Sequence, residues 1–446
     1  MTQKPVFVEG SMIRHVLVMT ASSSVGLVAI FVVDFLSLLY VSWLGDPALT
    51  AGVGYATQVL FFTMSANIGL SIAITALVAR AVGAGRRDDA RRIAGSGLLL
   101  TTVFAAALAL FLFVYRDKAL DLLGAQGEPH DVARRFLAIT LPANPLMALG
   151  MALQGLIRAC GDARRAMYVT LFGAIATAIL DPLLIFGLHF GVIGAAMSTV
   201  VSRCVFVAVG AWGARAHAIV GKPDGAALAK DLSPLFAIAG PAILTNLATP
   251  VGTSYSMRIL SSFGEQAVAA VAIIDRISPT AFGVLFALTG AIGPIIGQNL
   301  GAGQFSRVHR AVSDSFALTI GYVLTVWAML YFAAPFIADL FNAQGETRAL
   351  VIFFCKYAVV MWVFLGGLFV ANAAFNNLGY PFLPTVFNWG RATIGMMIFV
   401  PLGAKYYGAE GGLMGVALGS AIFGLAAVIA CFAVLRRIAR RNAAAA

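Results

Sequence analysis

The stretch Thr177-Ala-Ile-Leu-Asp-Pro-Leu-Leu-Ile-Phe-Gly187 is apolar except for Thr177 and one carboxylate, Asp181. An acidic side chain near the centre of a bilayer costs about 2.5–3.5 kcal/mol on insertion scales, so it normally faces a cavity, pairs with another group, or handles an ion or proton. A second such run, Ile30-Phe-Val-Val-Asp-Phe-Leu-Ser-Leu-Leu39, contains Asp34. We therefore predict that Asp34 and Asp181 form the functional centre of a membrane protein.

The composition of the whole chain supports this class. Of the 446 residues, 60% are hydrophobic and only 11% are charged, and the mean hydropathy is +0.91. These values lie outside the range of soluble globular proteins. The net charge of +11 comes mostly from short connections between apolar runs, which is typical of positive-inside topology. The expected surroundings are therefore a lipid bilayer, and no nucleic-acid partner is expected.

Apolar runs long enough to cross a bilayer recur along the chain, so we predict an all-α membrane protein with twelve membrane-spanning helices. The expected ranges are 14–43, 51–80, 95–114, 132–157, 166–188, 190–214, 234–262, 266–297, 312–338, 348–377, 383–404 and 411–435. They form an N-terminal six-helix lobe (1–214), a cytoplasmic linker (215–233) and a C-terminal six-helix lobe (234–446). Lys and Arg are concentrated in the even-numbered connections and the tail, which predicts that both termini are cytoplasmic.

An internal repeat relates the two lobes. Val78-Ala-Arg-Ala-Val-Gly-Ala-Gly85 recurs as Ile296-Gly-Gln-Asn-Leu-Gly-Ala-Gly303, an offset of 218 residues. This offset spans an even number of helices, so the halves have the same orientation and form two pseudo-symmetric bundles around a central site. The positions that match Asp34 and Asp181 are Thr253 and Val400, so ion chemistry is expected in the first half.

Several motifs resemble those of the multidrug and toxic compound extrusion (MATE) transporters. Besides the Gly-Ala-Gly pair, they are Arg158-Ala-Cys-Gly-Asp162, Leu180-Asp-Pro-Leu-Leu-Ile185, Gly191-Val-Ile-Gly-Ala-Ala-Met-Ser-Thr199 and Ile292-Gly-Pro-Ile-Ile-Gly-Gln-Asn-Leu-Gly-Ala-Gly303. The resemblance implies the MATE fold and a monomer in the bacterial cytoplasmic membrane. It also implies efflux of small amphipathic, often cationic compounds in exchange for H⁺ or Na⁺, with no other cofactor.

Within this family the chain looks like the branch related to the DinF proteins. The resemblance places Asp34 on the first-helix acid, Asp181 on the fifth-helix acid and Thr199 on a sixth-helix threonine proposed as a sodium ligand. Thr177 stands where the family commonly has Asn, one turn before Asp181. These four residues are the predicted cation-coupling site and a possible Na⁺ site.

Each of the other polar residues in apolar runs has two possible roles. Asn144 can line a substrate cavity or satisfy broken backbone, and Gln58 can line the cavity or form an interhelical hydrogen bond. Asp275 and Arg276 can form a structural pair or touch substrate. Arg391 can snorkel or tune the charge of the substrate site.

The alternative to multidrug efflux is a flippase or exporter for lipid-linked oligosaccharides or metabolites, from the same broad superfamily. An enzyme is not expected, because neither Gly-x-Ser-x-Gly nor His-Glu-x-x-His occurs in the sequence.

Overall fold

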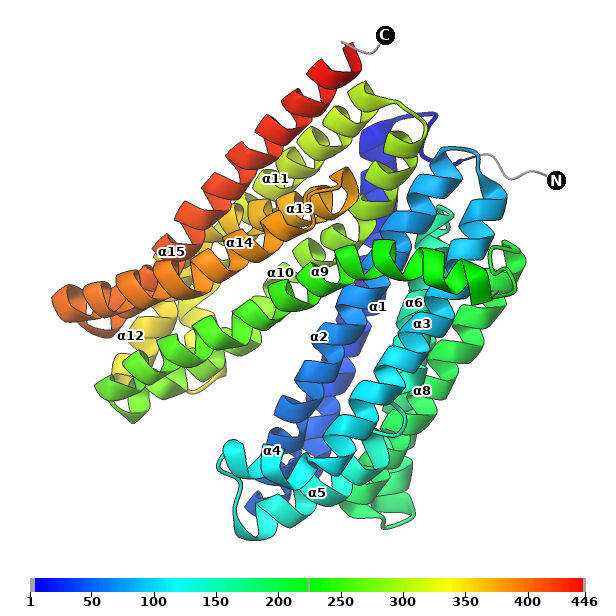
Figure 1. Ribbon diagram of the computed structural model, residues 1–446. Helices are drawn as coiled ribbons and strands as arrows, with labels where there is room; N and C mark the ends of the chain where they lie inside the picture. The colour runs from blue at the N-terminus through cyan, green and yellow to red at the C-terminus, as the bar shows by residue number, and fades with distance from the viewer. Residues whose placement is uncertain (1–4, 224, 444–446) are drawn as a thin grey trace. The chain divides into compact units, whose positions relative to one another are not determined.

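The computed structural model describes residues 5–223 and 225–443, and this part of the chain is built from helices (Figure 1). The predicted cytoplasmic location of the two termini concerns the extreme ends of the chain, which lie outside the described residues. In the N-terminal half the elements are α1 (Met12–Ser42), α2 (Pro47–Gly83), α3 (Arg87–Val114), α4 (Arg116–Leu122), α5 (Gly127–Thr140), α6 (Asn144–Ala159), α7 (Ala163–Pro182), the π-helix η1 (Leu183–Gly187) and α8 (Gly191–Ala216).

The C-terminal half contains two further π-helices, η3 and η5. Its elements are α9 (Gly225–Leu260), η2 (Ser261–Phe263), α10 (Glu265–Gly301), α11 (Phe305–Leu340), α12 (Gly345–Phe353), η3 (Phe354–Ala358), η4 (Val359–Met361), α13 (Trp362–Leu378), α14 (Phe382–Gly390), η5 (Arg391–Gly395) and α15 (Met396–Ala443).

The number of membrane spans agrees with the predicted twelve. Ten helical runs in the described chain are long and apolar enough to cross a bilayer, and α5 with α6, bent by 54°, makes an eleventh. The last run, Phe382–Arg441, has 60 residues. At about 1.5 Å per residue it is far too long for one crossing of a bilayer about 30 Å thick. Tyr407 and Gly408 interrupt its helical geometry, so it forms two spans.

The two arms of this last run lie against each other. A Cβ atom added at Gly403 would lie 2.0 Å from the Gly411 carbonyl oxygen, and one added at Gly411 would lie 2.1 Å from the Gly403 carbonyl oxygen. Gly415 and Gly419, each one turn further on, face Phe399 and Gly395 in the same way. A stripe of glycines therefore lets two helix backbones approach to direct contact.

The described chain divides into two compact units. One contains Ala21–Ile243 with the residues before Glu9, and the other contains Glu9–Thr20 with the residues from Leu244 onward. Helices α1 and α9 therefore contribute to both units. The predicted linker packs on the first unit, because the Gly221 N–H donates to the Arg91 carbonyl at 2.9 Å and Arg92 forms an ion pair with the buried Asp231.

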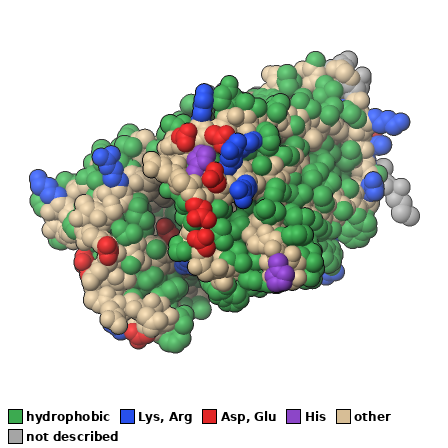
Figure 2. Space-filling model, turned by 90° about the horizontal axis from the view of Figure 1, so that it is seen from below, with side chains coloured by type: hydrophobic (Ala, Val, Ile, Leu, Met, Phe, Trp, Pro, Cys, Tyr) green, Lys and Arg blue, Asp and Glu red, His purple; other side chains and the backbone are tan. Residues whose placement is uncertain are grey.

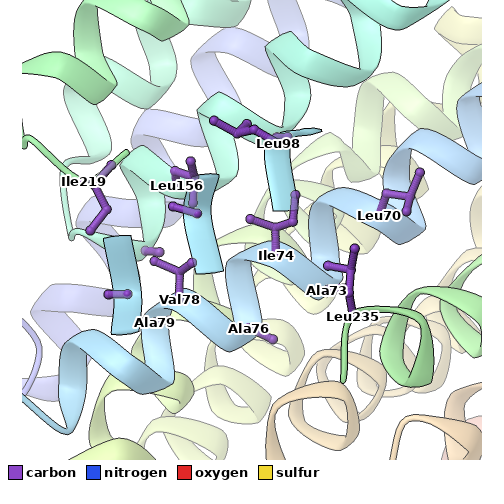
Figure 3. Close-up of a cluster of buried hydrophobic side chains, with 14 of the residues drawn as sticks. Leu70, Ala73, Ile74, Ala76, Val78, Ala79, Leu98, Leu156, Ile219 and Leu235 are labelled. Atoms are coloured by element: carbon purple, nitrogen blue, oxygen red, sulfur yellow. The ribbon is translucent and has the colours of Figure 1, made fainter. Parts of the chain in front are cut away.

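A cluster of buried aliphatic side chains forms the core of the first unit (Figure 3). Leu70, Ile74 and Val78 are spaced by four residues, so they share one face of α2. Leu98 of α3 and Leu156 of α6 pack in the same cluster. This core holds α2, α3 and α6 in a fixed arrangement.

The outer surface is apolar, as expected for a protein surrounded by lipid. Hydrophobic side chains cover much of the face seen in Figure 2, and charged side chains gather in separate patches. The most exposed apolar side chains include Leu110 of α3 and Phe332 and Phe336 of α11. Such broad apolar surface is unusual for a soluble monomer and suits a bilayer environment.

Asp162 connects α6 to α7 and caps the N-terminus of α7. Its carboxylate accepts the Arg165 backbone N–H at 3.0 Å, pairs with the Arg165 guanidinium at 2.7 Å and lies 3.0 Å from His217 Nε2. Burial raises the pKa of Asp162, but the hydrogen bonds from Arg165 and His217 outweigh it, so the pKa lies below its ordinary value.

We expect Asp162→Ala to lower the free energy of unfolding by about 1–2 kcal/mol at neutral pH, because it removes the cap and the ion pair with Arg165. A lowered pKa in the folded state stabilises the protein above the unfolded pKa of about 3.9, and this contribution is lost as pH falls through the folded value. Unfolding of both proteins in detergent at several pH values tests this. Asp88→Ala, at the exposed start of α3, is the control and should change stability by less than about 0.5 kcal/mol. A difference for Asp162→Ala that stays constant down to acidic pH would contradict the assignment.

Candidate ion-coupling site

The site lies where α1 and α7 meet in the first unit. Asp34 of α1 and Asp181 of α7 are close enough for their carboxylates to interact electrostatically. Asp181 is only 2% exposed, whereas the Asp34 side chain is exposed. The structure therefore brings together the two acids that the sequence analysis singled out, one buried and one accessible.

The helix is irregular directly after Asp181. Pro182 has no N–H, so it cannot donate to the carbonyl four residues earlier. The chain continues as the π-helix η1 (Leu183–Gly187) before α8 begins. Single π-turns inside longer helices are frequent at functional sites, because the extra residue per turn redirects the neighbouring side chains. The carboxylate of Asp181 therefore lies directly before a local break in its helix.

Two hydroxyl groups surround the buried carboxylate. Ser37 of α1 donates a hydrogen bond to Asp181. The buried hydroxyl of Ser198 on α8 lies near the same carboxylate and has no other hydrogen-bond partner within the described residues. Neither serine was among the residues predicted from the sequence. For Ser37 a signal existed, because it follows Asp34 by three residues and therefore lies on the same face of α1.

Each predicted threonine donates its hydroxyl to a backbone carbonyl of its own helix. The Thr177 hydroxyl donates to the Gly173 carbonyl at 3.2 Å, and the Thr199 hydroxyl donates to the Ala195 carbonyl at 3.0 Å. Thr177 lies one turn before Asp181 on the same face of α7. Thr199 directly follows Ser198, so its side chain points about 100° away around α8. The hydroxyl of α8 that acts on Asp181 is that of Ser198.

Asn144 is placed at the bend between α5 and α6. It is 1% exposed, accepts a hydrogen bond from Asn67 at 2.9 Å and donates to the Ala105 carbonyl at 3.2 Å. These contacts tie the broken span to α2 and α3. Of the two readings of Asn144, the structural one matches this geometry. Gln58 is an exposed residue of α2.

The remaining candidates belong to the second unit. Asp275 and Arg276 are exposed on α10, and adjacent helix residues do not face each other, so the geometry does not favour a pair between them. Arg391 begins the π-helix η5 and is 5% exposed. Its Nη2 donates to the Thr249 hydroxyl at 3.2 Å. Arg391 is therefore buried and does not snorkel.

The donor set around Asp181 consists of oxygen atoms. Carboxylate and hydroxyl oxygens suit a proton or a hard cation. Within the described residues there is no cluster of three or more His, Cys, Asp or Glu side chains of the kind that holds a transition metal. The arrangement can thus bind a proton or a small hard cation.

The chain resembles known proteins over almost its entire length. The family model MatE matches residues 23–183 and again residues 241–402, and the two matches begin at the offset of the internal repeat. The FAD transporter of Shewanella oneidensis is 27% identical over 95% of this chain and 94% of its own. The "Probable multidrug resistance protein NorM" of Thermotoga maritima is 25% identical over 64% of this chain and 63% of its own.

A solved structure shares the fold. The crystal structure of the Vibrio cholerae MATE transporter VcmN in the bent form has a TM-score of 0.91 and 25% sequence identity, covering 96% of this chain and 97% of that one. This likeness agrees with the two predicted six-helix bundles. Together with the family match over both halves of the sequence, it identifies the chain as a member of the MatE family of membrane transporters.

Proposed function

We propose that this transporter is a secondary active efflux antiporter of the bacterial cytoplasmic membrane. It exports amphipathic, often cationic compounds in exchange for H⁺ or Na⁺ by alternating access. The observation that carries the proposal is the pair of interacting carboxylates, Asp34 and Asp181, inside the membrane-spanning part of the first unit. Ser37 donates a hydrogen bond to Asp181. The relative named for multidrug resistance supports an organic cargo.

The mechanism follows from the charge of this pair. Two carboxylates in a medium of low dielectric constant repel each other, so an empty site attracts a cation. When a proton or Na⁺ enters from outside, the site loses negative charge and its hold on a cationic compound weakens. The compound is released, and the emptied acids can bind another from inside. The membrane potential contributes about 2.3 kcal/mol per charge per 100 mV to inward cation movement.

The relative named as an FAD transporter favours a second candidate, an exporter of metabolites that carry anionic groups. The two candidates share the coupling site and differ in the cargo. The experiment below uses an organic cation, so it tests the antiport mechanism with the cargo of the first candidate.

The experiment uses the full-length protein in proteoliposomes loaded with a fluorescent organic cation. Sodium and proton gradients are imposed separately, each with and without an ionophore that collapses it. We expect one gradient alone to drive efflux and the ionophore to abolish it. Efflux that proceeds equally with no gradient would contradict the proposal, because it would indicate a passive pathway.

A further inference from the structure

The second unit buries an arginine whose charge no acid of the described chain offsets. Arg391 donates one hydrogen bond, to Thr249 at 3.2 Å, and its Nε has no acceptor. None of the ion pairs in the described residues includes it. A buried guanidinium normally has a carboxylate or several acceptors, because removing the charge from water is costly. Arg391 therefore has no negatively charged partner among the described residues.

Arg203 of the first unit shows what a structural arginine looks like in this protein. It is 9% exposed, and its Nη1 donates to the Thr140 carbonyl at 2.5 Å. Thr140 is the last residue of α5, and the final carbonyls of a helix lack helical partners and carry partial negative charge. Arg203 thus completes a helix end, whereas Arg391 contacts only a hydroxyl group.

The neighbours of Arg391 hold it in place. Trp389 donates its indole N–H to the Leu244 carbonyl at 2.9 Å. A Cβ atom added at Gly252 would lie 3.1 Å from the Ala392 Cα, so α9 and η5 are in close contact. Asn388, one turn before Arg391, donates to Asn372 at 3.2 Å.

The residue that the guanidinium contacts lies at the surface. The hydroxyl that it contacts belongs to Thr249, which is exposed on α9. The guanidinium therefore lies beneath a residue at the surface of the second unit. Arg391 also begins a π-helix, a feature that is frequent at functional sites.

The internal repeat relates this contact to the coupling site, but the ionic group has the opposite charge. In the first unit, the first and fifth spans meet through Ser37 and Asp181. In the second unit, the corresponding spans α9 and α14 with η5 meet through Thr249 and Arg391. Each unit thus joins a hydroxyl of its first span to one ionic group of its fifth span. That group is an acid in one unit and a base in the other.

We propose that Arg391, with Thr249, binds the carboxylate or phosphate group of a transported organic compound. The oxygens of such a group can accept hydrogen bonds from Nε and an Nη of one guanidinium together, a geometry that lysine cannot offer. This inference rests on the proposed function and adds to it a class of cargo that includes zwitterions and anions. Such compounds can differ from simple cations in where they bind and still share the same coupling acids.

Binding measurements that need no gradient test this inference separately from ion coupling. The probes are a xanthene dye with a free carboxylate and the methyl ester of the same dye, which differ in that charge and in one methyl group. Fluorescence anisotropy with the full-length protein in phosphatidylcholine nanodiscs gives the dissociation constant of each probe. We expect the wild type to bind the acid about tenfold more tightly than the ester, as one charge-assisted hydrogen bond allows.

The variants assign the preference to Arg391. Arg391→Gln should bind both dyes alike, with the affinity for the ester unchanged. Arg203→Gln is the matched control and should keep the wild-type preference. Thr249→Glu supplies a carboxylate from an exposed position, so it should also remove the preference, and it tests the site if Arg391→Gln fails to fold.

Two results would overturn the site: equal binding of acid and ester by the wild type, or a preference that persists in both Arg391→Gln and Thr249→Glu. Asp34→Asn should keep the preference for the acid even if it cannot couple transport. A failure of the coupling proposal is therefore distinguishable from a failure of this one.

Discussion

Asp181→Asn is expected to reduce gradient-driven efflux from proteoliposomes by about 100-fold, near the upper end of typical coupling free energies between two ligands. Asparagine keeps the size of the side chain and an oxygen that can accept the hydrogen bond from Ser37. It cannot bind a proton or carry the negative charge that attracts a cation. Asp181 is buried, at 2% exposure, so bulk water cannot take the place of its carboxylate as a partner for the cation. The initial rate of efflux under each imposed gradient measures the effect.

Asp34→Asn should lose coupling in the same assay, because Asp34 and Asp181 act on one another electrostatically. Ser37→Ala should have a smaller effect, about tenfold in the ion concentration that half-saturates efflux, since it removes one hydrogen bond to a charged group. Asp275→Asn is the matched control, as it neutralises an exposed carboxylate of α10 in the other unit. If both Asp34→Asn and Asp181→Asn pump normally, the coupling site lies elsewhere.

Gly403→Val is expected to lower the free energy of unfolding by about 3 kcal/mol or more, at the upper end of typical overpacking costs. Its first side-chain carbon would have to occupy a point 2.0 Å from the Gly411 carbonyl oxygen. The obstacle is backbone, which cannot move aside as a flexible side chain can. The last two spans would therefore have to separate along their whole glycine-lined contact. The midpoint of thermal unfolding in detergent and the yield of monodisperse protein measure the loss.

The control for this prediction is the same substitution at Gly321 of α11. A Cβ atom there meets nothing within 4 Å, so Gly321→Val should change stability by less than about 0.5 kcal/mol. Equal destabilisation at the two positions would mean that valine itself, and not the contact between the arms, is responsible.

The sequence by itself determined the membrane class, the twelve spans and the repeat. These properties are local or periodic: a span is recognised from about 20 consecutive apolar residues, and the repeat from matched motifs such as Gly83-Ala-Gly85 and Gly301-Ala-Gly303. The acids Asp34 and Asp181 were also found in this way, because a carboxylate inside an apolar run stands out without any knowledge of its neighbours.

Only the tertiary structure decided which groups surround those acids. Ser37 and Ser198 are ordinary residues of their helices until the packing of α1, α7 and α8 brings them to Asp181. The rotation of each helix about its axis sets these contacts, and an apolar span has little periodicity from which that rotation can be read.

The roles of Asn144 and Arg391 were also decided by the tertiary structure. Both are polar residues in apolar runs, and the sequence left their roles open. Packing turned Asn144 into a link between α2, α3 and a bent span, and it left Arg391 buried beside a single hydroxyl. A polar group inside a membrane protein is defined by the partners that satisfy it, and those partners come from helices far apart in the sequence.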